Sequence, residues 1–227
     1  MFSDKKVVLF DLDGTLVDSA PDLALAVNHM LERLDRDAFC PSVIRSWVGN
    51  GAATLVKRGL SGSSNIDEDI DCELFEQALE IFLNFYADNL CVDTVTYPNV
   101  LKTLKILKSQ DYRLVIVTNK PYDFVEPLLS GLELSEFFEF CVGGDSLDKR
   151  KPHPMPLLHV CERLDVEVSD CVMIGDSKND IVAATAANMH SIGVTYGYNY
   201  GEDISLYKPN HIVDDFHDIL PLFGSSK

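Results

Sequence analysis

The sequence predicts an α/β fold: a doubly wound, Rossmann-like parallel-sheet core with one inserted all-helical domain. Short apolar runs rich in β-branched residues recur along the chain, and segments with the 3.6-residue period of helices lie between them. Strands that alternate with helices are typical of parallel sheets with crossover helices. A long stretch after the first run has helical patterns and no convincing strand, which indicates the insertion.

The expected strands are short and apolar, as strands buried on both faces are. They are VVLF at 7–10, LVIVT at 114–118, FEFCVGG at 138–144, CVMIG at 171–175 and SIGV at 191–194. Helices of the core are expected over 100–108, 154–164 and 180–187. The helical insertion is expected over 18–94, which leaves 1–17 and 95–227 as the core.

Composition is that of a soluble globular protein, since 46% of the 227 residues are hydrophobic and 24% are charged. The formal net charge of -17 repels polyanions, so nucleic-acid binding is not expected. The N-terminal apolar run is too short for a signal peptide or a membrane span, and the six cysteines form no C-x-x-C pair. We therefore expect a cytoplasmic protein with free thiols, no membrane partner, and a monomeric or homodimeric state.

The strongest chemical signal is Asp11-Leu12-Asp13-Gly14-Thr15, which directly follows the first strand. Ligands of open α/β sheets bind at the carboxyl ends of strands. Residues two apart on extended backbone share one face, so Asp11 and Asp13 are expected to address one substrate. Two carboxylates so close need a cation or a proton between them, and Mg²⁺ prefers such oxygen ligands. The alternative interpretation is a capping or turn role.

Three further polar groups follow other expected strands. Thr118-Asn119-Lys120 offers a hydroxyl and backbone amides to a phosphate oxygen, although a helix N-cap is the alternative. Lys151 can offset the charge of a phosphate, unless it is a solvated surface lysine or the neighbouring Lys149 or Arg150 takes that role. Asp176 and Asp180 lie one helical turn apart if a helix begins between them, so both can join one metal site with the first carboxylate. Four such groups at four strand ends are hard to explain as four separate caps.

The four groups stand in the sequence as DLDGT, VTN, KP and GDSKND, and this set resembles the motifs of the haloacid dehalogenase-like superfamily over the whole chain. The longer stretches WVGNGAATLV at 47–56, KRKPHPMPLL at 149–158 and TYGYNYGE at 195–202 are similar to the bacterial phosphoglycolate phosphatase family within it. The resemblance implies a Mg²⁺-dependent phosphatase that acts on a small phosphorylated metabolite, 2-phosphoglycolate, and releases glycolate and phosphate.

The resemblance also implies roles for single residues. Asp11 would be the nucleophile that is transiently phosphorylated, and Asp13 would protonate the leaving alcohol and then activate water. Mg²⁺ would be held by the Asp11 carboxylate, the Asp13 backbone carbonyl and Asp176, with Asp180 outside these ligands. Phosphate would be bound by Thr118, Asn119 and Lys151, and the helical insertion would be a cap that closes over the site.

Substrate contacts from the cap are expected from Arg45, Asn50 and Gly51, because a doubly anionic substrate needs positive or amide groups there. An Asn-Gly turn that ends a helix is the alternative. Trp47 and the tyrosines near 196–200 are expected to pack rather than to stack on a ligand.

Other activities remain open from the residues alone. A phosphatase or phosphomutase of the same superfamily acting on a sugar phosphate would use the same motifs. A phosphorylation-switched signalling domain also places acids, a Thr and a Lys around Mg²⁺, but it normally lacks a second carboxylate such as Asp13 and a helical insertion. A catalytically dead interaction protein would not need the complete set of charged groups.

Overall fold

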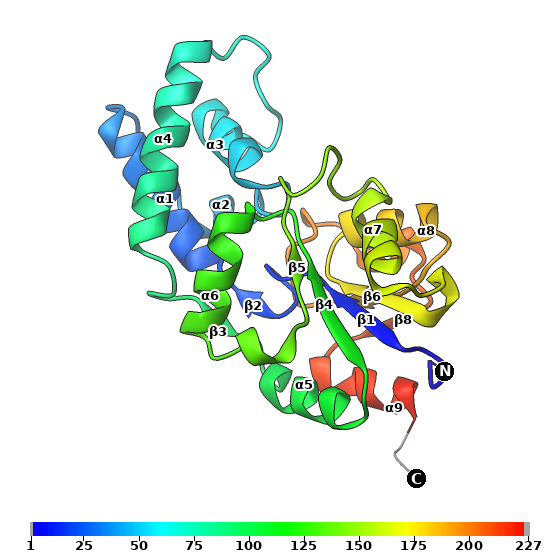
Figure 1. The fold of residues 1–227 in the computed structure, drawn as a ribbon. Helices are drawn as coiled ribbons and strands as arrows, with labels where there is room; N and C mark the ends of the chain where they lie inside the picture. The colour runs from blue at the N-terminus through cyan, green and yellow to red at the C-terminus, as the bar shows by residue number, and fades with distance from the viewer. Residues whose placement is uncertain (1, 225–227) are drawn as a thin grey trace.

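A six-stranded parallel sheet lies at the centre of this computed structural model, which describes residues 2–224 (Figure 1). The strand order is β5-β4-β1-β6-β7-β8. The strands are β1 Val7–Phe10, β4 Arg113–Val117, β5 Cys141–Val142, β6 Cys171–Gly175, β7 His190–Val194 and β8 His211–Val213. With helices on both faces, this sheet confirms the predicted doubly wound α/β fold.

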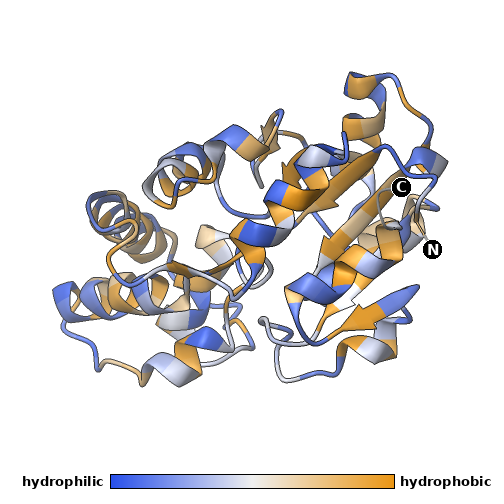
Figure 2. Ribbon diagram, turned by 90° about the horizontal axis from the view of Figure 1, so that it is seen from below, coloured by the Kyte–Doolittle hydropathy of each residue, from blue (hydrophilic) through white to orange (hydrophobic). Residues whose placement is uncertain are grey.

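The apolar runs form strands here because both faces of the sheet are covered. Val8 and Phe10 belong to a hydrophobic cluster on one face, and Val7 and Leu9 to a cluster on the other. Figure 2 shows the strands as mostly hydrophobic between the surrounding helices. One face carries α5 Val100–Ser109, α6 Val125–Gly131 and α9 Leu220–Phe223, and the other carries α7 Met155–Leu164 and α8 Lys178–Ala186.

The chain changes direction across the sheet at β1. From β1 it proceeds outward to β4 and β5, then returns to the other side of β1 for β6, β7 and β8. Phe10 at the end of β1 is in register with Ile116 of β4 and Ile174 of β6. The carboxyl end of β1 is therefore the topological switch point, where ligands of such sheets bind.

Four helices form a separate group beyond the carboxyl edge of the sheet (Figure 1). They are α1 Ala20–Arg33, α2 Pro41–Arg45, α3 Ala52–Ser61 and α4 Cys72–Asp88, and they share their own hydrophobic cluster. The two connections to the sheet pair as an antiparallel ribbon, β2 Val17–Asp18 with β3 Val95–Thr96. The predicted limits of the helical insertion fall at this ribbon, and the division into two domains remains a proposal. We call these four helices the cap.

Asp22 in α1 fixes the segment by which the chain leaves the cap. One carboxylate oxygen accepts hydrogen bonds from the Val92 N–H (3.1 Å), the Thr94 N–H (3.1 Å) and the Thr94 hydroxyl (2.6 Å). The other oxygen accepts from the Asp93 N–H (2.8 Å). Because Asp22 is only 1% exposed, these four donors replace its water shell.

Some elements differ from the prediction. The sequence pattern did not predict β2, β3 or β8; the first two have two residues each, and His211 and Ile212 in β8 are exposed at the sheet edge. Short 3₁₀ helices occupy Tyr122–Phe124, Ser135–Phe137, Val168–Asp170, Ile204–Tyr207 and Phe216–Ile219. Within residues 2–224, no helix has the length and apolar character needed to cross a membrane.

Candidate active site

Strand β1 places Asp11 at the middle of the carboxyl edge of the sheet. The Asp11 N–H donates to the Ile174 carbonyl (3.0 Å), which extends the pairing with β6 by one residue. The backbone then bends at Leu12 and turns over residues 14–16, so the extended backbone assumed from the sequence ends at Asp11. Asp11 and Asp13 still line one cavity, because the turn brings both carboxylates to the same side.

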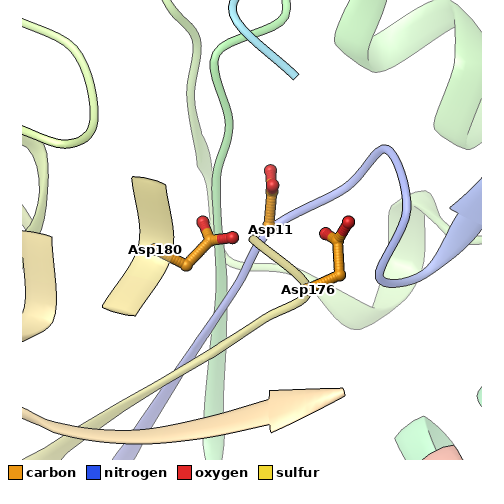
Figure 3. A group of neighbouring side chains, drawn as sticks. All are labelled: Asp11, Asp176 and Asp180. Atoms are coloured by element: carbon orange, nitrogen blue, oxygen red, sulfur yellow. The ribbon is translucent and has the colours of Figure 1, made fainter. Parts of the chain in front are cut away.

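Three buried carboxylates meet at this edge. Oxygen atoms of Asp11, Asp176 and Asp180 all lie within 4.8 Å of one another. Figure 3 shows the three side chains beside one another, with the Asp180 carboxylate pointing toward Asp11. Asp176 directly follows β6, and Ser177 caps α8 by donating its N–H (3.0 Å) and hydroxyl (2.8 Å) to Asp180. This capping box explains why a helix starts at once after Asp176 and brings Asp180 back to the site.

The electrostatics of this cluster favour a bound cation. Burial raises the pKa of Asp11 to about 7, with the neighbouring Asp180 adding to the rise and Lys151 opposing it. Burial and the two neighbouring carboxylates raise the pKa of Asp176 well above its ordinary value. One ammonium faces three carboxylates, so negative charge is left over. A hard divalent cation such as Mg²⁺ fits this all-oxygen donor set.

Lys151 is buried in the cluster, with an exposed fraction of 1%. Its Nζ lies 3.0 Å from an Asp11 oxygen, and it donates to Asp180 (2.6 Å) and to the Val117 carbonyl. The alternative of a solvated surface lysine is therefore wrong. Its ammonium is held where it offsets the carboxylates and any phosphate placed beside Asp11.

Thr118 and Asn119 follow β4, and their side chains are used differently. The Thr118 hydroxyl oxygen accepts the Lys120 N–H (3.1 Å), so the hydroxyl proton is available to a ligand. The Asn119 amide group donates to the Lys151 carbonyl (3.0 Å) and to the Gly49 carbonyl of the cap (3.1 Å). Both N–H donors of this side chain are thus occupied, and Asn119 can offer a phosphate only its backbone N–H.

The sequence analysis gave the Lys120 side chain no role and did not identify Tyr86 as a site residue. Lys120 Nζ lies 3.1 and 3.3 Å from the two oxygens of Asp13 and donates to the Tyr86 hydroxyl (2.7 Å). The Ser19 hydroxyl also donates to Asp13 (2.5 Å). The only sequence signal for Lys120 was its place directly after Thr118-Asn119, and Tyr86 resembles any apolar residue of a cap helix.

The comparison with known sequences identifies the family. A profile of the haloacid dehalogenase-like hydrolases matches residues 8–194. The chain belongs to the haloacid dehalogenase-like hydrolase family. It is 53% identical over 217 residues to the phosphoglycolate phosphatase of Colwellia psychrerythraea, covering 96% of each chain. It is 46% identical over 214 residues to the phosphoglycolate phosphatase of Psychrobacter arcticus, covering 94% of this chain and 93% of that one.

A solved structure agrees with the sequence relatives. The "predicted phosphoglycolate phosphatase" of Haemophilus somnus matches this chain with a TM-score of 0.90 at 39% identity. The match covers 96% of this chain and 98% of the other.

The hydrolase has a partly open cavity of about 40 Å³ between the core and the cap. Its core side includes Asp11, Asp13 and Thr118. Its apolar side chains come mostly from the cap, with Pro121 and Phe124 from the core: Leu23, Val48, Ala52, Leu55, Phe82, Pro121 and Phe124. A ligand enclosed here meets few polar side chains beyond those at the end of β1 and β4.

The loop between α2 and α3, which we call the cap loop, is hydrogen-bonded to the core of the hydrolase through the Gly49 carbonyl. The Gly49 oxygen accepts hydrogen bonds from the side-chain amides of Asn119 (3.1 Å) and Asn179 (3.1 Å). Gly49 has a φ of +119°, and a Cβ there would lie 2.5 Å from the Tyr200 hydroxyl. Only glycine suits this position.

Of the three cap residues expected to contact the substrate, only Gly51 lines the cavity. Gly51 lines the cavity and caps the start of α3 with a φ of +80°, so the Asn50-Gly51 turn begins a helix and does not end one. Asn50 is not among the residues that line the cavity, and neither is Arg45. Arg45 instead pairs with Asp18 (2.8 Å) and donates to the Tyr97 hydroxyl (3.2 Å).

Trp47 is 3% exposed and belongs to the hydrophobic cluster of the cap, in line with the expected packing role. Tyr198 is 4% exposed and packs against the same cluster.

Proposed function

We propose that this hydrolase is a phosphoglycolate phosphatase that converts 2-phosphoglycolate and water to glycolate and phosphate, with Mg²⁺ as its cofactor, in the cytoplasm. The observation that carries the proposal is the small cavity in which Asp11 and Asp13 face an otherwise mostly apolar cap. The names of the relatives at 53% and 46% identity support the substrate.

The proposed reaction has two steps at Asp11. Its carboxylate oxygen attacks phosphorus, the bond from phosphorus to the ester oxygen breaks, and the glycolate oxygen takes a proton from Asp13. Water then attacks the phosphorus of the phosphorylated Asp11 and gives a proton to Asp13, and the bond from phosphorus to the Asp11 oxygen breaks, which frees Asp11 and phosphate. Ser19 and Lys120 hold Asp13 by hydrogen bonds of 2.5 and 3.1 Å, which orients it for both transfers.

Phosphate binding is assigned to the core. The Thr118 hydroxyl has a proton to donate, the Asn119 backbone supplies an N–H, and Lys151 places its ammonium 3.0 Å from Asp11. Asp11, Asp176 and the Asp13 backbone carbonyl would hold Mg²⁺, with Asp180 beside them. When bound, the cation offsets the charge of these carboxylates and of the phosphate.

The lining of the cavity also favours a short substrate over a sugar phosphate. The hydroxyls of a sugar would lose water against Leu23, Leu55 and Phe82, which cannot hydrogen-bond to them. Each unpaired buried hydroxyl costs about 1–3 kcal/mol. We therefore expect kcat/KM for glucose 6-phosphate to be at least about 100-fold below that for 2-phosphoglycolate, given about 1.4 kcal/mol per factor of ten.

The test is phosphate release from 2-phosphoglycolate, glucose 6-phosphate and other small esters, with and without EDTA. Asp11→Asn should abolish release, and the exposed Asp37→Asn is the matched control that should leave it intact. A preference for another ester would refute the substrate assignment. Metal-independent release that survives Asp11→Asn would refute the mechanism.

A further inference from the structure

The cavity is lined by a lysine side chain, Lys120, whose charge is not needed to bind the phosphate. Lys120 is the one cationic side chain among the described residues that line it, and it is 4% exposed. Its Nζ lies beside Asp13, which meets the leaving group, whereas Lys151 lies beside Asp11, which meets phosphorus. The two ammonium groups therefore serve opposite ends of a bound ester.

Lys120 is held as a charged donor at the leaving-group end. Burial opposes its charge, but the Asp13 carboxylate and the Tyr86 oxygen outweigh this effect, and the pKa of Lys120 lies above its ordinary value. Its three N–H donors face three acceptor atoms, the two Asp13 oxygens (3.1 and 3.3 Å) and the Tyr86 hydroxyl (2.7 Å). An incoming carboxylate would replace only the longest of these contacts, and Lys120 would keep one hydrogen bond to Asp13 and the one to Tyr86.

The groups around Lys120 also favour a negative charge. Because Lys120 donates to the Tyr86 hydroxyl, the proton of that hydroxyl is left to be donated. Burial raises the pKa of Tyr86 to about 12, so the hydroxyl keeps this proton near neutral pH. The N-terminus of α3, at Gly51 and Ala52, lines the same cavity and presents backbone N–H groups.

We propose that Lys120, together with the Tyr86 hydroxyl, binds the carboxylate of the leaving group and so selects phosphate esters of short hydroxy acids. This inference depends on the proposed function. In 2-phosphoglycolate a single CH₂ separates the carboxylate from the ester oxygen that Asp13 protonates. A carboxylate receptor must then lie next to Asp13, which is the position of Lys120.

The charge of Lys120 discriminates between leaving groups of similar size. A neutral alcohol of the same length would leave the buried ammonium without its anionic partner, and a cationic amine would be repelled by it. A charge-assisted hydrogen bond contributes about 10- to 150-fold to binding, from about 1.5–3 kcal/mol. Lys120 is therefore a specificity-determining residue for the leaving group rather than for the phosphate.

The experiment compares kcat/KM for 2-phosphoglycolate, ethyl phosphate and phosphoethanolamine, which all have two-carbon leaving groups but differ in the charge at the far end. In the wild type we expect 2-phosphoglycolate to be preferred. In Lys120→Met the ratio of 2-phosphoglycolate to ethyl phosphate should fall about 100-fold, and in Tyr86→Phe about 10-fold. Lys102→Met, at an exposed position of α5, is the matched control and should keep the wild-type ratio.

The outcomes separate this inference from the proposed function. If the wild type does not prefer 2-phosphoglycolate, the proposed function fails. If the wild type prefers it but Lys120→Met lowers kcat/KM for all three esters by the same factor, Lys120 only supports Asp13 and the inference is overturned. If Lys120→Met does not fold, Lys120→Arg and Tyr86→Phe decide: the arginine variant should retain the preference and the phenylalanine variant should weaken it.

Discussion

Replacing Asp22 with asparagine tests whether one buried carboxylate fixes the junction between the cap and the core. The substitution keeps the shape of the side chain and removes its charge. The best placement of the new amide keeps its oxygen where three donors from Val92 and Thr94 converge. The new NH₂ group then faces the Asp93 N–H, so two donors meet; water reaches the exposed Asp93, but the buried NH₂ group is left without an acceptor.

The magnitude follows from these four contacts. An unpaired buried donor costs about 1–3 kcal/mol, and each of the three remaining bonds loses about 1 kcal/mol when its acceptor becomes neutral. No discount for solvent applies, because Asp22 is 1% exposed. We expect the free energy of unfolding to fall by about 4–6 kcal/mol, or roughly 10–20 °C in Tm for a chain of this size.

The assay is urea denaturation followed by circular dichroism, supported by thermal melting. Glu80→Gln, an exposed acid-to-amide change in α4, is the matched control and should shift the free energy of unfolding by less than about 0.5 kcal/mol. If the free energy of unfolding falls by less than about 1 kcal/mol in Asp22→Asn, residues 92–94 find other hydrogen-bond partners and the reasoning is wrong.

Three further predictions concern the site. The pKa of Asp11 in the fold, about 7, lies above the ordinary value of an aspartate, 3.8, so the metal-free fold binds more protons than the unfolded chain and loses up to about 1.4 kcal/mol of stability per pH unit as pH rises between these values. Mg²⁺ should consequently raise Tm more at pH 7.5 than at pH 5.5 in thermal melts, and equal shifts would contradict this. In Gly197→Ala the new Cβ would lie 2.3 Å from an Asp176 oxygen, so the Mg²⁺ concentration for half-maximal activity should rise at least about 10-fold; an unchanged value would show that the loop adapts. Lys151→Met leaves Asp180 without its 2.6 Å partner and should lower the free energy of unfolding by about 3–5 kcal/mol in urea titrations, whereas near-neutral behaviour would show that the Ser177 N–H and hydroxyl are sufficient partners for Asp180.

The sequence was most informative where both faces of a strand are buried. β1 and β6 have the limits expected from their apolar runs, because a strand with no solvent face leaves an uninterrupted hydrophobic signal. β8 was missed for the opposite reason, since His211 and Ile212 are exposed at the edge of the sheet. The two-residue strands β2 and β3 exist only through their mutual pairing, which no local pattern encodes.

The positions of the candidate site residues were also predictable only in part. Asp11 and Asp176 could be placed at the carboxyl edge of the sheet, because each directly follows a recognisable strand. Tyr86 could not, since it reaches Lys120 across 34 positions of sequence and lies on a helix whose pattern indicates only packing. Arg45 was assigned to the substrate because the cap needed a cation, but Asp18 takes its guanidinium in the fold. Pairing between distant charges is decided by tertiary structure, and residue type alone does not predict it.

The attachment of the cap loop has an implication for how such enzymes diverge. The cap contributes a main-chain oxygen, Gly49, while both amides that grip it, Asn119 and Asn179, belong to the core. A carbonyl is present whatever the neighbouring side chains are. Residues such as Val48 and Leu55 can therefore be replaced to suit a new leaving group, while the two hydrogen bonds that position the loop stay the same. In this chain, the apolar side chains that line the cavity are therefore different groups from those that position the loop.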